Sequence, residues 1–409
     1  MTSLSITRSK AKAYLAGTAG NILEHFDQAL YGFLAPFLAP IFFPSSDPIY
    51  GLIAAYALLP LGLISKPLGA LVFGWFGDRI GRKFVLSITL FGMALVTALM
   101  GFLPTYEQAG WIAPSLLALG RLLQNFFAAG ENTGGALFLL EQTSTQRRGW
   151  VSSLFDTSAI FGIMLASAAA LLWGDQWRLL YFAGALTAVA GFAIRRSAMN
   201  DAPIKEPPGI RDFLKEWRSI ASIALVIGYS YGNYYLITNL FNGFLPLVSN
   251  ISLQDAMAMN TLLLFLDMLL LPFFGYLSQR IAKENLMLAA LIAGIVFSLP
   301  FFLLLEGASA WLAGSIRIAL MVIGVCFSAC YHAWAMEQCS PKVRFTVCAL
   351  GFAFGSRLIG APMPALSLWL FHKTGWIGSA DIPVLIAALL ALGPLLKSRA
   401  AAAAQRSAS

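Results

Sequence analysis

Long apolar stretches separated by short polar segments run along the whole chain. Each reaches about 18 residues or more, the length that an α-helix needs to cross the hydrocarbon core of a bilayer. Several exceed the roughly 20 residues of a perpendicular crossing, so tilted or kinked helices are expected. The pattern predicts twelve spanning helices, over residues 14–40, 50–74, 84–103, 111–139, 150–172, 177–194, 219–247, 253–277, 285–305, 311–334, 345–371 and 380–396.

The composition agrees with a chain that folds in lipid. Hydrophobic residues make up 58% of the 409 residues, and charged residues only 11%. A soluble protein of this length could not cover its surface with so few charged side chains. We therefore predict an all-α polytopic membrane protein.

The net charge of +8 would suit a nucleic-acid-binding protein, but the positions of the basic residues indicate membrane topology instead. When the N-terminus and every second loop are assigned to the cytoplasm, 21 of the 27 lysines and arginines fall on that side. Arg178 and Lys373 fall on the other side. Basic residues accumulate in cytoplasmic loops of membrane proteins, so both termini are predicted to be cytoplasmic and no nucleic-acid partner is expected.

The two halves of the chain share a spaced set of charged residues. At a constant offset of 196 residues, Arg121, Glu141 and Arg148 are matched by Arg317, Glu337 and Arg344. Such a repeat in an apolar chain indicates a duplicated helical bundle, which is typical of secondary transporters. A charged stretch with prolines lies between the halves. We predict a six-helix bundle over 1–194, a cytoplasmic linker over 195–218, and a second bundle with a short cytoplasmic tail over 219–409.

The loop between the second and third predicted helices carries a specific motif. Residues 74–83 read GWFGDRIGRK. This text resembles the major facilitator superfamily, whose hallmark at this place is G-x-x-x-D-R-x-G-R-K. A degenerate copy, GYLSQRIAK at residues 275–283, follows the eighth predicted helix. The resemblance implies a fold of twelve transmembrane helices in two pseudo-symmetric six-helix bundles, and transport of a small molecule by alternating access.

A narrower resemblance begins in the first predicted helix. Residues 20–33 read GNILEHFDQALYGF, and a Phe-Phe-Pro segment follows at residues 42–44. This text is similar to the metabolite:proton symporter family, whose members carry proline and betaine, α-ketoglutarate, citrate, shikimate and similar solutes. Residues 121–131, RLLQNFFAAGE, resemble the family's R-x-x-Q-G-x-x-x-G-G-E, with Asn125 and Ala129 in place of glycines. The resemblance implies proton-coupled symport of a small polar or charged metabolite, an organic acid or a betaine- or proline-like solute.

Carboxylates at membrane depth are the candidates for proton coupling. Glu24 and Asp27 lie three residues apart and so share one face of a helix. A charge there costs at least about 2.5–3.5 kcal/mol, so it should face water or a partner. We predict that Asp27 takes the proton and that Arg121 is its partner, with Glu24 and Glu131 as alternates. A static ion pair between the first and fourth helices is the other interpretation. Thr238 stands at the position that matches Asp27, which would confine coupling to the first half.

Buried cations and tyrosines are the candidates for substrate binding. A guanidinium can bind a carboxylate substrate through two hydrogen bonds, and tyrosine rings can bind a quaternary ammonium group by cation–π contact. The alternatives are internal pairing, with Asp156 or Asp267 as counter-charges, and ordinary packing of the aromatic rings. The predicted substrate-binding residues are Lys66, Arg317, Arg357, Tyr31, Tyr231 and Tyr235.

The motif loop also supplies a predicted cytoplasmic gate. By resemblance, its aspartate and arginine bind the end of the fourth helix and the start of the eleventh in one state of the carrier. Opposite charges that meet in one state and separate in the other are sufficient for such a latch. Ordinary surface ion pairs are the alternative. The gate residues are Gly74, Asp78, Arg79, Gly81, Arg82, Lys83, Glu141 and Arg148.

Other classes of protein are less consistent with this sequence. A membrane enzyme would need a catalytic motif such as H-E-x-x-H, and the chain does not contain it. Cys326, Cys330 and His332 lie close in sequence, but helix packing explains them better than a metal site does. We predict a monomer in the cytoplasmic (inner) membrane, bound by lipid, with its substrate and protons as ligands and no cofactor. A proton-independent exchanger or an exporter of the same superfamily is the alternative function.

Overall fold

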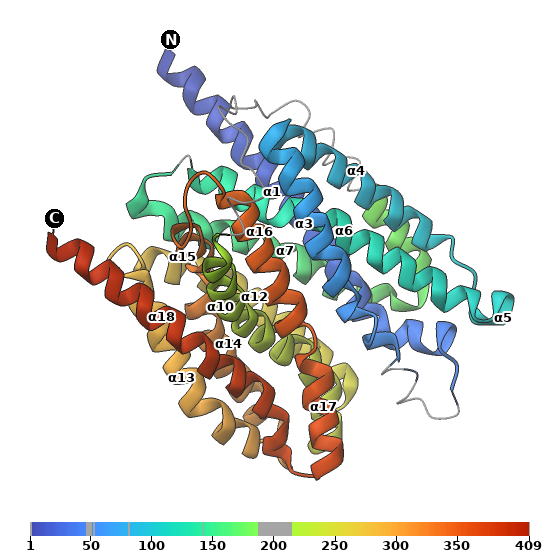
Figure 1. Cartoon of the computed structure of the whole chain (residues 1–409). Coiled ribbons are helices and arrows are strands. Elements are labelled where there is room, and N and C mark those ends of the chain that lie inside the picture. The colour runs from blue at the N-terminus through green and yellow to red at the C-terminus, as the bar shows by residue number, and fades with distance from the viewer. Residues whose placement is uncertain are drawn as a thin grey trace. The chain divides into compact units, whose positions relative to one another are not determined.

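The computed structural model describes residues 2–45, 51, 54–80, 82–141, 143–186 and 215–408. Nearly all of these residues are helical (Figure 1). The chain divides into two units: unit 1 comprises residues 1–142 and 158–214, and unit 2 comprises residues 143–157 and 215–409. Most of the predicted linker, from residue 195 to residue 214, lies outside the described residues.

Unit 1 is built around α6, which packs against α1, α3 and α4. A Cβ at Gly69 of α3 would collide with the main-chain oxygen of Phe126, so the missing side chain lets α3 approach α6 closely. The elements are α1 (Thr2–Phe42), η1 (Leu59–Leu61), α3 (Gly62–Arg79), α4 (Arg82–Gly101), α5 (Tyr106–Ala109), α6 (Ile112–Glu141), η3 (Gly174–Gln176) and the part of α7 (Arg148–Trp173) from Ser158 onward.

Unit 2 begins with η2 (Thr145–Arg147) and the first ten residues of α7, residues 148–157. Its central helix is α10, which packs against α16, α18 and the turn that follows α16. The remaining elements are α10 (Trp217–Tyr235), η4 (Leu236–Leu240), α11 (Phe241–Val248), α12 (Leu253–Leu277), α13 (Lys283–Leu303), α14 (Ala310–Ser328), α15 (Tyr331–Glu337), α16 (Arg344–Phe354), η5 (Gly355–Gly360), α17 (Met363–Thr374), η6 (Ile377–Asp381) and α18 (Ile382–Ala408).

Three spanning segments of unit 2 are interrupted. Both η4 and η5 are π-helical turns inside longer helices. In η4 the N–H of Phe241 bonds to the carbonyl of Leu236, five residues back, so the carbonyl of Ile237 is left for another donor. Between α14 and α15 the helix breaks at residues 329–330 and resumes at Tyr331. Each interruption frees main-chain groups or redirects side chains inside an otherwise regular helix.

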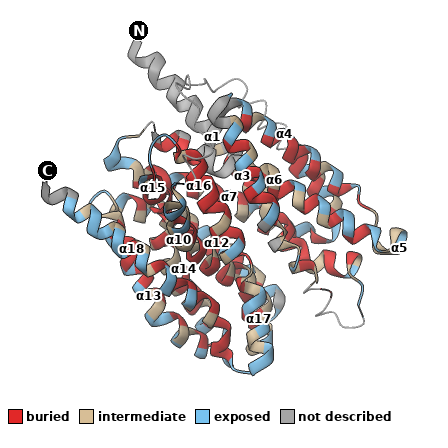
Figure 2. Cartoon of the chain, in the orientation of Figure 1, coloured by how far each residue is buried: buried red, intermediate tan, exposed pale blue. Residues whose placement is uncertain are grey.

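The distribution of buried and exposed residues suits lipid rather than water. Leu90 and Ala94 of α4 are buried, while a stripe at helical spacing along the same helix is exposed. Figure 2 shows exposed positions alternating with buried ones along the helices of both units. In a soluble protein such a continuous apolar stripe would be an aggregation site, whereas in a bilayer it contacts acyl chains. The stripe comprises Phe84, Ile88, Phe91, Leu95 and Leu99.

The predicted segments agree with the observed helices. Each of the twelve is helical over most of its described length. Within the described residues, eight helical segments are long and apolar enough to cross a membrane, and two shorter apolar helices lie at residues 64–76 and 87–101. The segment predicted at 177–194 is helical as far as residue 186, where the described part ends.

Candidate functional site

The polar centre of unit 1 is a chain of hydrogen bonds that runs from a guanidinium to a carboxylate. Arg121 of α6 donates to Oε1 of Gln124 at 2.9 Å. Gln124 donates through Nε2 to the hydroxyl of Thr97 on α4, also at 2.9 Å. Thr97 donates in turn to Oδ2 of Asp27 on α1 at 3.3 Å. Every bond points the same way, so the predicted cation and carboxylate are connected through two neutral side chains.

Asp27 is almost completely buried, at 1% exposure. Its second oxygen, Oδ1, has no hydrogen-bond partner in the described structure. That oxygen lies where a Cβ on Gly184 would be, so the glycine makes room for the carboxylate. No ion pair joins Asp27 to Arg121 among the described residues, although Arg121 is close enough for their charges to interact. A carboxylate in this setting can change protonation without first breaking a direct salt bridge.

The neighbours of Asp27 on α1 complete this centre. Glu24 is fully buried, and Nε2 of Gln28 donates to its Oε1 at 2.5 Å. The ring of Tyr31 lies under the guanidinium of Arg121, with its centroid 4.4 Å from Cζ. The hydroxyl of Tyr31 donates to the main-chain oxygen of Ala55 at 2.7 Å. The side chain of Glu131, the remaining coupling candidate, lies outside the described residues.

The repeated arginine of unit 2 has a different set of partners. Arg317 of α14 is completely buried and donates to the main-chain oxygens of Ala256 at 3.0 Å and Ile237 at 2.9 Å. It also donates to the side-chain oxygens of Asn242 at 3.2 Å and Asn260 at 2.9 Å. All four acceptors are neutral carbonyl groups. Arg317 therefore ties α14 to α12, η4 and α11, and it would have to give up these bonds to bind a carboxylate.

The other predicted substrate-binding residues lie on α3, on η5 and on α10. Lys66 of α3 is buried in unit 1. Arg357 is buried within the π-helical turn η5 of unit 2. Tyr231 and Tyr235 lie one turn apart on α10, with ring centroids separated by 6.0 Å. The structure thus places a buried cation in each unit and a tyrosine pair in unit 2.

For the predicted gate, the structure describes the surroundings of Glu337, the residue in unit 2 that matches Glu141. Glu337 of α15, the repeat of Glu141, accepts from Lys283 at 2.7 Å and lies 4.0 Å from Arg148. Lys283 also contacts Glu284 at 3.3 Å. Gly74 is buried on α3. The side chains of the other predicted gate residues lie outside the described residues: Asp78, Arg79, Gly81, Arg82, Lys83 and Glu141.

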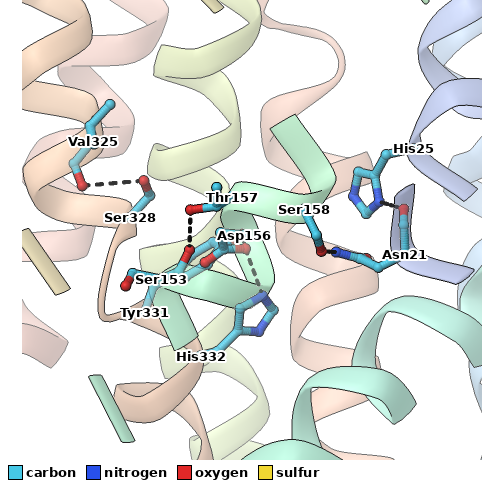
Figure 3. Close-up of polar contacts among 10 residues, drawn as sticks. All are labelled: Asn21, His25, Ser153, Asp156, Thr157, Ser158, Val325, Ser328, Tyr331 and His332. Atoms are coloured by element: carbon cyan, nitrogen blue, oxygen red, sulfur yellow. Dashed lines mark hydrogen bonds and ion pairs between the residues drawn. The ribbon is translucent and has the colours of Figure 1, made fainter. Parts of the chain in front are cut away.

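A second polar cluster lies in unit 2, where α7 meets α15 (Figure 3). Oδ1 of Asp156 accepts from the hydroxyl of Tyr331 at 3.1 Å and lies 3.2 Å from Nε2 of His332. The sequence pattern suggested packing for His332 and a counter-charge role for Asp156, and it did not connect them. In unit 1, Ser158 of the same helix accepts from Asn21 of α1 at 2.8 Å (Figure 3).

Several side chains in these two hydrogen-bond networks were missed because they are neutral. Thr97 has no sequence signal beyond being a polar residue in an apolar helix, which is also true of Asn242 and Asn260. Gln124 stood inside the quoted family motif but had no role assigned. A search for every polar side chain at membrane depth, charged or not, would have found all four.

These features define a polytopic helical carrier with a duplicated, polar centre, and comparison with known proteins gives its family. The profile of the Major Facilitator Superfamily matches residues 18–364. The chain is 30% identical over 399 residues to the proline/betaine transporter of Salmonella typhimurium (strain LT2), covering 89% of this chain and 78% of that protein. It is 29% identical to the citrate-proton symporter of Salmonella typhi, covering 93% and 92%. It is 27% identical to the alpha-ketoglutarate permease of Escherichia coli (strain K12), covering 89% and 88%.

Solved structures agree on the fold. The proton:xylose symporter XylE, bound to 6-bromo-6-deoxy-D-glucose, superposes with a TM-score of 0.70 at 12% identity, covering 95% of each chain. The human organic anion transporter MFSD10 gives a TM-score of 0.64 at 16% identity, covering 94% of this chain and 98% of that one. The chain belongs to the major facilitator superfamily, which confirms the predicted family and the twelve-helix fold class. It is a multi-pass membrane transporter and not an enzyme.

Proposed function

We propose that this transporter is a secondary active carrier that imports a small polar or charged metabolite together with protons, by alternating access. It acts in the cytoplasmic (inner) membrane as a monomer with both termini in the cytoplasm. The two bundles over 1–194 and 219–409, joined by the linker over 195–218, are the moving parts. Its relatives include a protein named a citrate-proton symporter, which supports proton coupling in this chain.

The observation that carries this proposal is the one-way chain of donors from Arg121 to Asp27. Thr97 and Gln124 link the two charged residues through neutral groups. When Asp27 is ionised, the chain delivers donors to its Oδ2; when Asp27 is protonated, the Thr97 bond weakens and the chain can rearrange. The protonation of one buried carboxylate is thus linked to the position of the Arg121 side chain and of helices α1, α4 and α6. That linkage is what a coupling site requires.

The substrate is an organic acid or a betaine- or proline-like solute. Lys66, Arg357 and Arg317 are the predicted cationic contacts, and Arg317 would have to give up hydrogen bonds to four carbonyl groups in order to bind a carboxylate. Tyr231 and Tyr235 offer ring faces to a quaternary ammonium group. The relatives carry names of both solute kinds, proline/betaine and citrate.

The gate follows the internal repeat. In unit 2, Lys283 from the degenerate copy of the motif pairs with Glu337. By the same symmetry, Arg82 or Lys83 of the complete copy pairs with Glu141 in one state of the carrier. The described ion pairs are partly exposed, so each contributes under about 1 kcal/mol and can separate during the transport cycle.

The test is transport by purified protein in proteoliposomes. A labelled panel of proline, betaine, α-ketoglutarate and citrate is offered with an imposed inward proton gradient. We expect one compound to accumulate, and an ionophore that collapses the gradient to abolish the accumulation. In Asp27→Asn the proton-driven accumulation disappears, while exchange of the same compound in preloaded vesicles continues, because the amide cannot take up and release a proton.

The matched control is Asp255→Asn, which makes the same chemical change at an exposed position near the start of α12. It should accumulate substrate like the unmodified protein. Undiminished accumulation in Asp27→Asn would remove Asp27 from the coupling mechanism. Exchange without gradient-driven accumulation in the unmodified protein would establish the proton-independent exchanger instead.

A further inference from the structure

The cluster around Asp156 has no role in the mechanism above. The side chain lies on α7, eight residues beyond Arg148, which places it about 12 Å along the helix axis from that end. Both of its hydrogen-bond partners, Tyr331 and His332, bind the same oxygen, Oδ1. The other oxygen, Oδ2, is buried and has no partner in the described structure. A buried carboxylate with one empty oxygen is costly when ionised unless a positive charge is close.

The charges near Asp156 do not include a permanent cation. Among the described residues no lysine or arginine pairs with it, and His332 is its ion-pair partner. Asp267 of α12 is a second buried carboxylate close enough for its charge to interact with that of Asp156. Two carboxylates and one imidazole are neutral together only when they hold two protons. The low dielectric of the interior favours that neutral state. Bound protons, rather than a lysine or arginine, must therefore neutralise the two carboxylates.

His332 is fixed in position to share one of these protons. Its ring stacks on Phe352 at 4.7 Å between centroids with an interplanar angle of 9°, and it meets the edge of Phe155 at 5.7 Å. The helix break at residues 329–330 starts α15 at Tyr331, so consecutive residues reach the same carboxylate oxygen. Imidazole is the side chain whose protonation changes near neutral pH. A proton held between Nε2 and Oδ1 would be shared by the imidazole and the carboxylate.

The other titratable groups on the neighbouring helices α10 and α13 make contacts of their own. Tyr231 of α10 makes a side-chain hydrogen bond with Tyr331, and Tyr234 of α10 lies near Asp267. The charges of α13, Lys283 and Glu284, pair with each other, and Lys283 also pairs with Glu337. No three of the described histidine, cysteine and acidic side chains are close enough together to hold a metal ion. A proton is the ligand that fits.

We infer that Asp156, His332 and Tyr331 form a second proton-binding site, in unit 2, distinct from Asp27 in unit 1. The site binds a proton between the carboxylate and the imidazole, and Tyr331 holds the shared oxygen in place. Asp267 carries the second proton that the neutral cluster requires. Proton binding in this carrier is then not confined to the half that contains Asp27, as the sequence alignment with Thr238 had suggested.

The test uses the small number of histidines. The chain has 3, His25, His332 and His372, so ¹⁵N-histidine labelling of the full-length protein in lipid gives few signals. His332→Gln assigns the His332 signal. The midpoint of its change from the protonated to the neutral form is then compared among variants. In Asp156→Asn its midpoint moves down by about one pH unit or more, because the imidazolium loses its negative partner. The control Asp255→Asn leaves the midpoint unchanged.

Tyr331→Phe is the second variant. It tests the same site if Asp156→Asn does not yield folded protein. Without the Tyr331 hydroxyl, His332 is the remaining donor to Oδ1. The carboxylate then stabilises the protonated imidazole more strongly, so the midpoint of the His332 signal moves to higher pH. A His332 signal that does not titrate, or that titrates identically in the unmodified protein and in the folded variants, would overturn the inference. The measurement needs neither substrate nor gradient, so its outcome is separate from that of the proposed symport.

Discussion

The two repeated arginines, Arg121 in unit 1 and Arg317 in unit 2, are 196 residues apart at matching places in the sequence repeat and have different surroundings. Arg121 donates to a side-chain amide that leads to a carboxylate. Arg317 donates to four neutral carbonyl oxygens, two of them on the main chain. Both side chains are buried and both lie beside an aromatic ring, Tyr31 and Phe241 respectively. Burial alone therefore does not distinguish a candidate coupling residue from a structural one.

The difference can be traced to the helix opposite each arginine. In unit 1, α1 is a regular helix at Asp27, and the acceptor comes from a side chain. In unit 2, the matching position is Thr238, in the middle of the π-helical turn η4. That turn frees the carbonyl of Ile237, which accepts from Arg317 directly. One unit thus uses a group that can be protonated, and the other uses a main-chain group that cannot.

Proton dependence should therefore lie at the arginine that is linked to a carboxylate, Arg121. A guanidinium held by carbonyl groups keeps its partners at every pH, so Arg317 stabilises the fold of unit 2. A guanidinium linked to a carboxylate has surroundings that change when the carboxylate is protonated. The Asp156 and His332 pair adds a titratable group to unit 2 at a different place, on α7 and α15.

The largest effect is expected from removing Arg317, the arginine that donates to four carbonyl groups. Arg317→Met leaves two main-chain carbonyls and two asparagine oxygens without their donor inside the membrane, so the free energy of unfolding should fall by about 3 kcal/mol or more. Arg121→Met removes the hydrogen bond to Gln124 and the contact with the Tyr31 ring, and Gln124 still bonds to Thr97, so we expect a smaller loss. Thermal unfolding in detergent, followed by tryptophan fluorescence, measures both variants. Equal losses would show that the two arginines play the same structural part.

A smaller and more specific effect is expected at Thr97. Thr97→Val keeps the shape of the side chain but removes the donor to ionised Asp27. The ionised form loses about 1.5 kcal/mol of stabilisation, so Asp27 keeps its proton to higher pH and the pH profile of proton-driven uptake moves up by about one unit.

The control for Thr97 lies on the same helix. Thr89→Val removes a hydroxyl that bonds the main chain of its own helix, to the oxygen of Val85, and should leave the pH profile unchanged. A profile that moves equally in both variants would point to a general change in α4 rather than to the bond with Asp27.

The smallest effect is expected from Tyr31→Phe. The ring under Arg121 remains, and only the bond to the oxygen of Ala55 is lost, which costs about 1 kcal/mol of stability. Uptake kinetics should keep the same KM. A KM raised tenfold or more would mean that the hydroxyl leaves Ala55 to bind substrate, and Tyr31 would then be a substrate contact as the sequence first suggested.

The architecture could be predicted from the sequence because the bilayer imposes it. Apolar stretches of spanning length must be helical in lipid, since their main-chain groups have no other partners there. The motif at residues 74–83 and the 196-residue repeat then identified the superfamily. Charged residues at membrane depth, such as Asp27 and Arg121, were also found directly, because each is an exception in an apolar helix.

The tertiary structure decided which of these exceptions have permanent partners. The sequence around Thr238 does not predict a π-helical turn. It therefore does not predict that the main-chain oxygen of Ile237 accepts a hydrogen bond from Arg317. His332 and Asp156 are 176 residues apart in the chain, and only packing brings them within 3.2 Å. The sequence determined the membrane fold, the family and the list of charged candidates. Hydrogen bonding depends on ångström-scale distances between distant segments, and those distances exist only once the helices have packed.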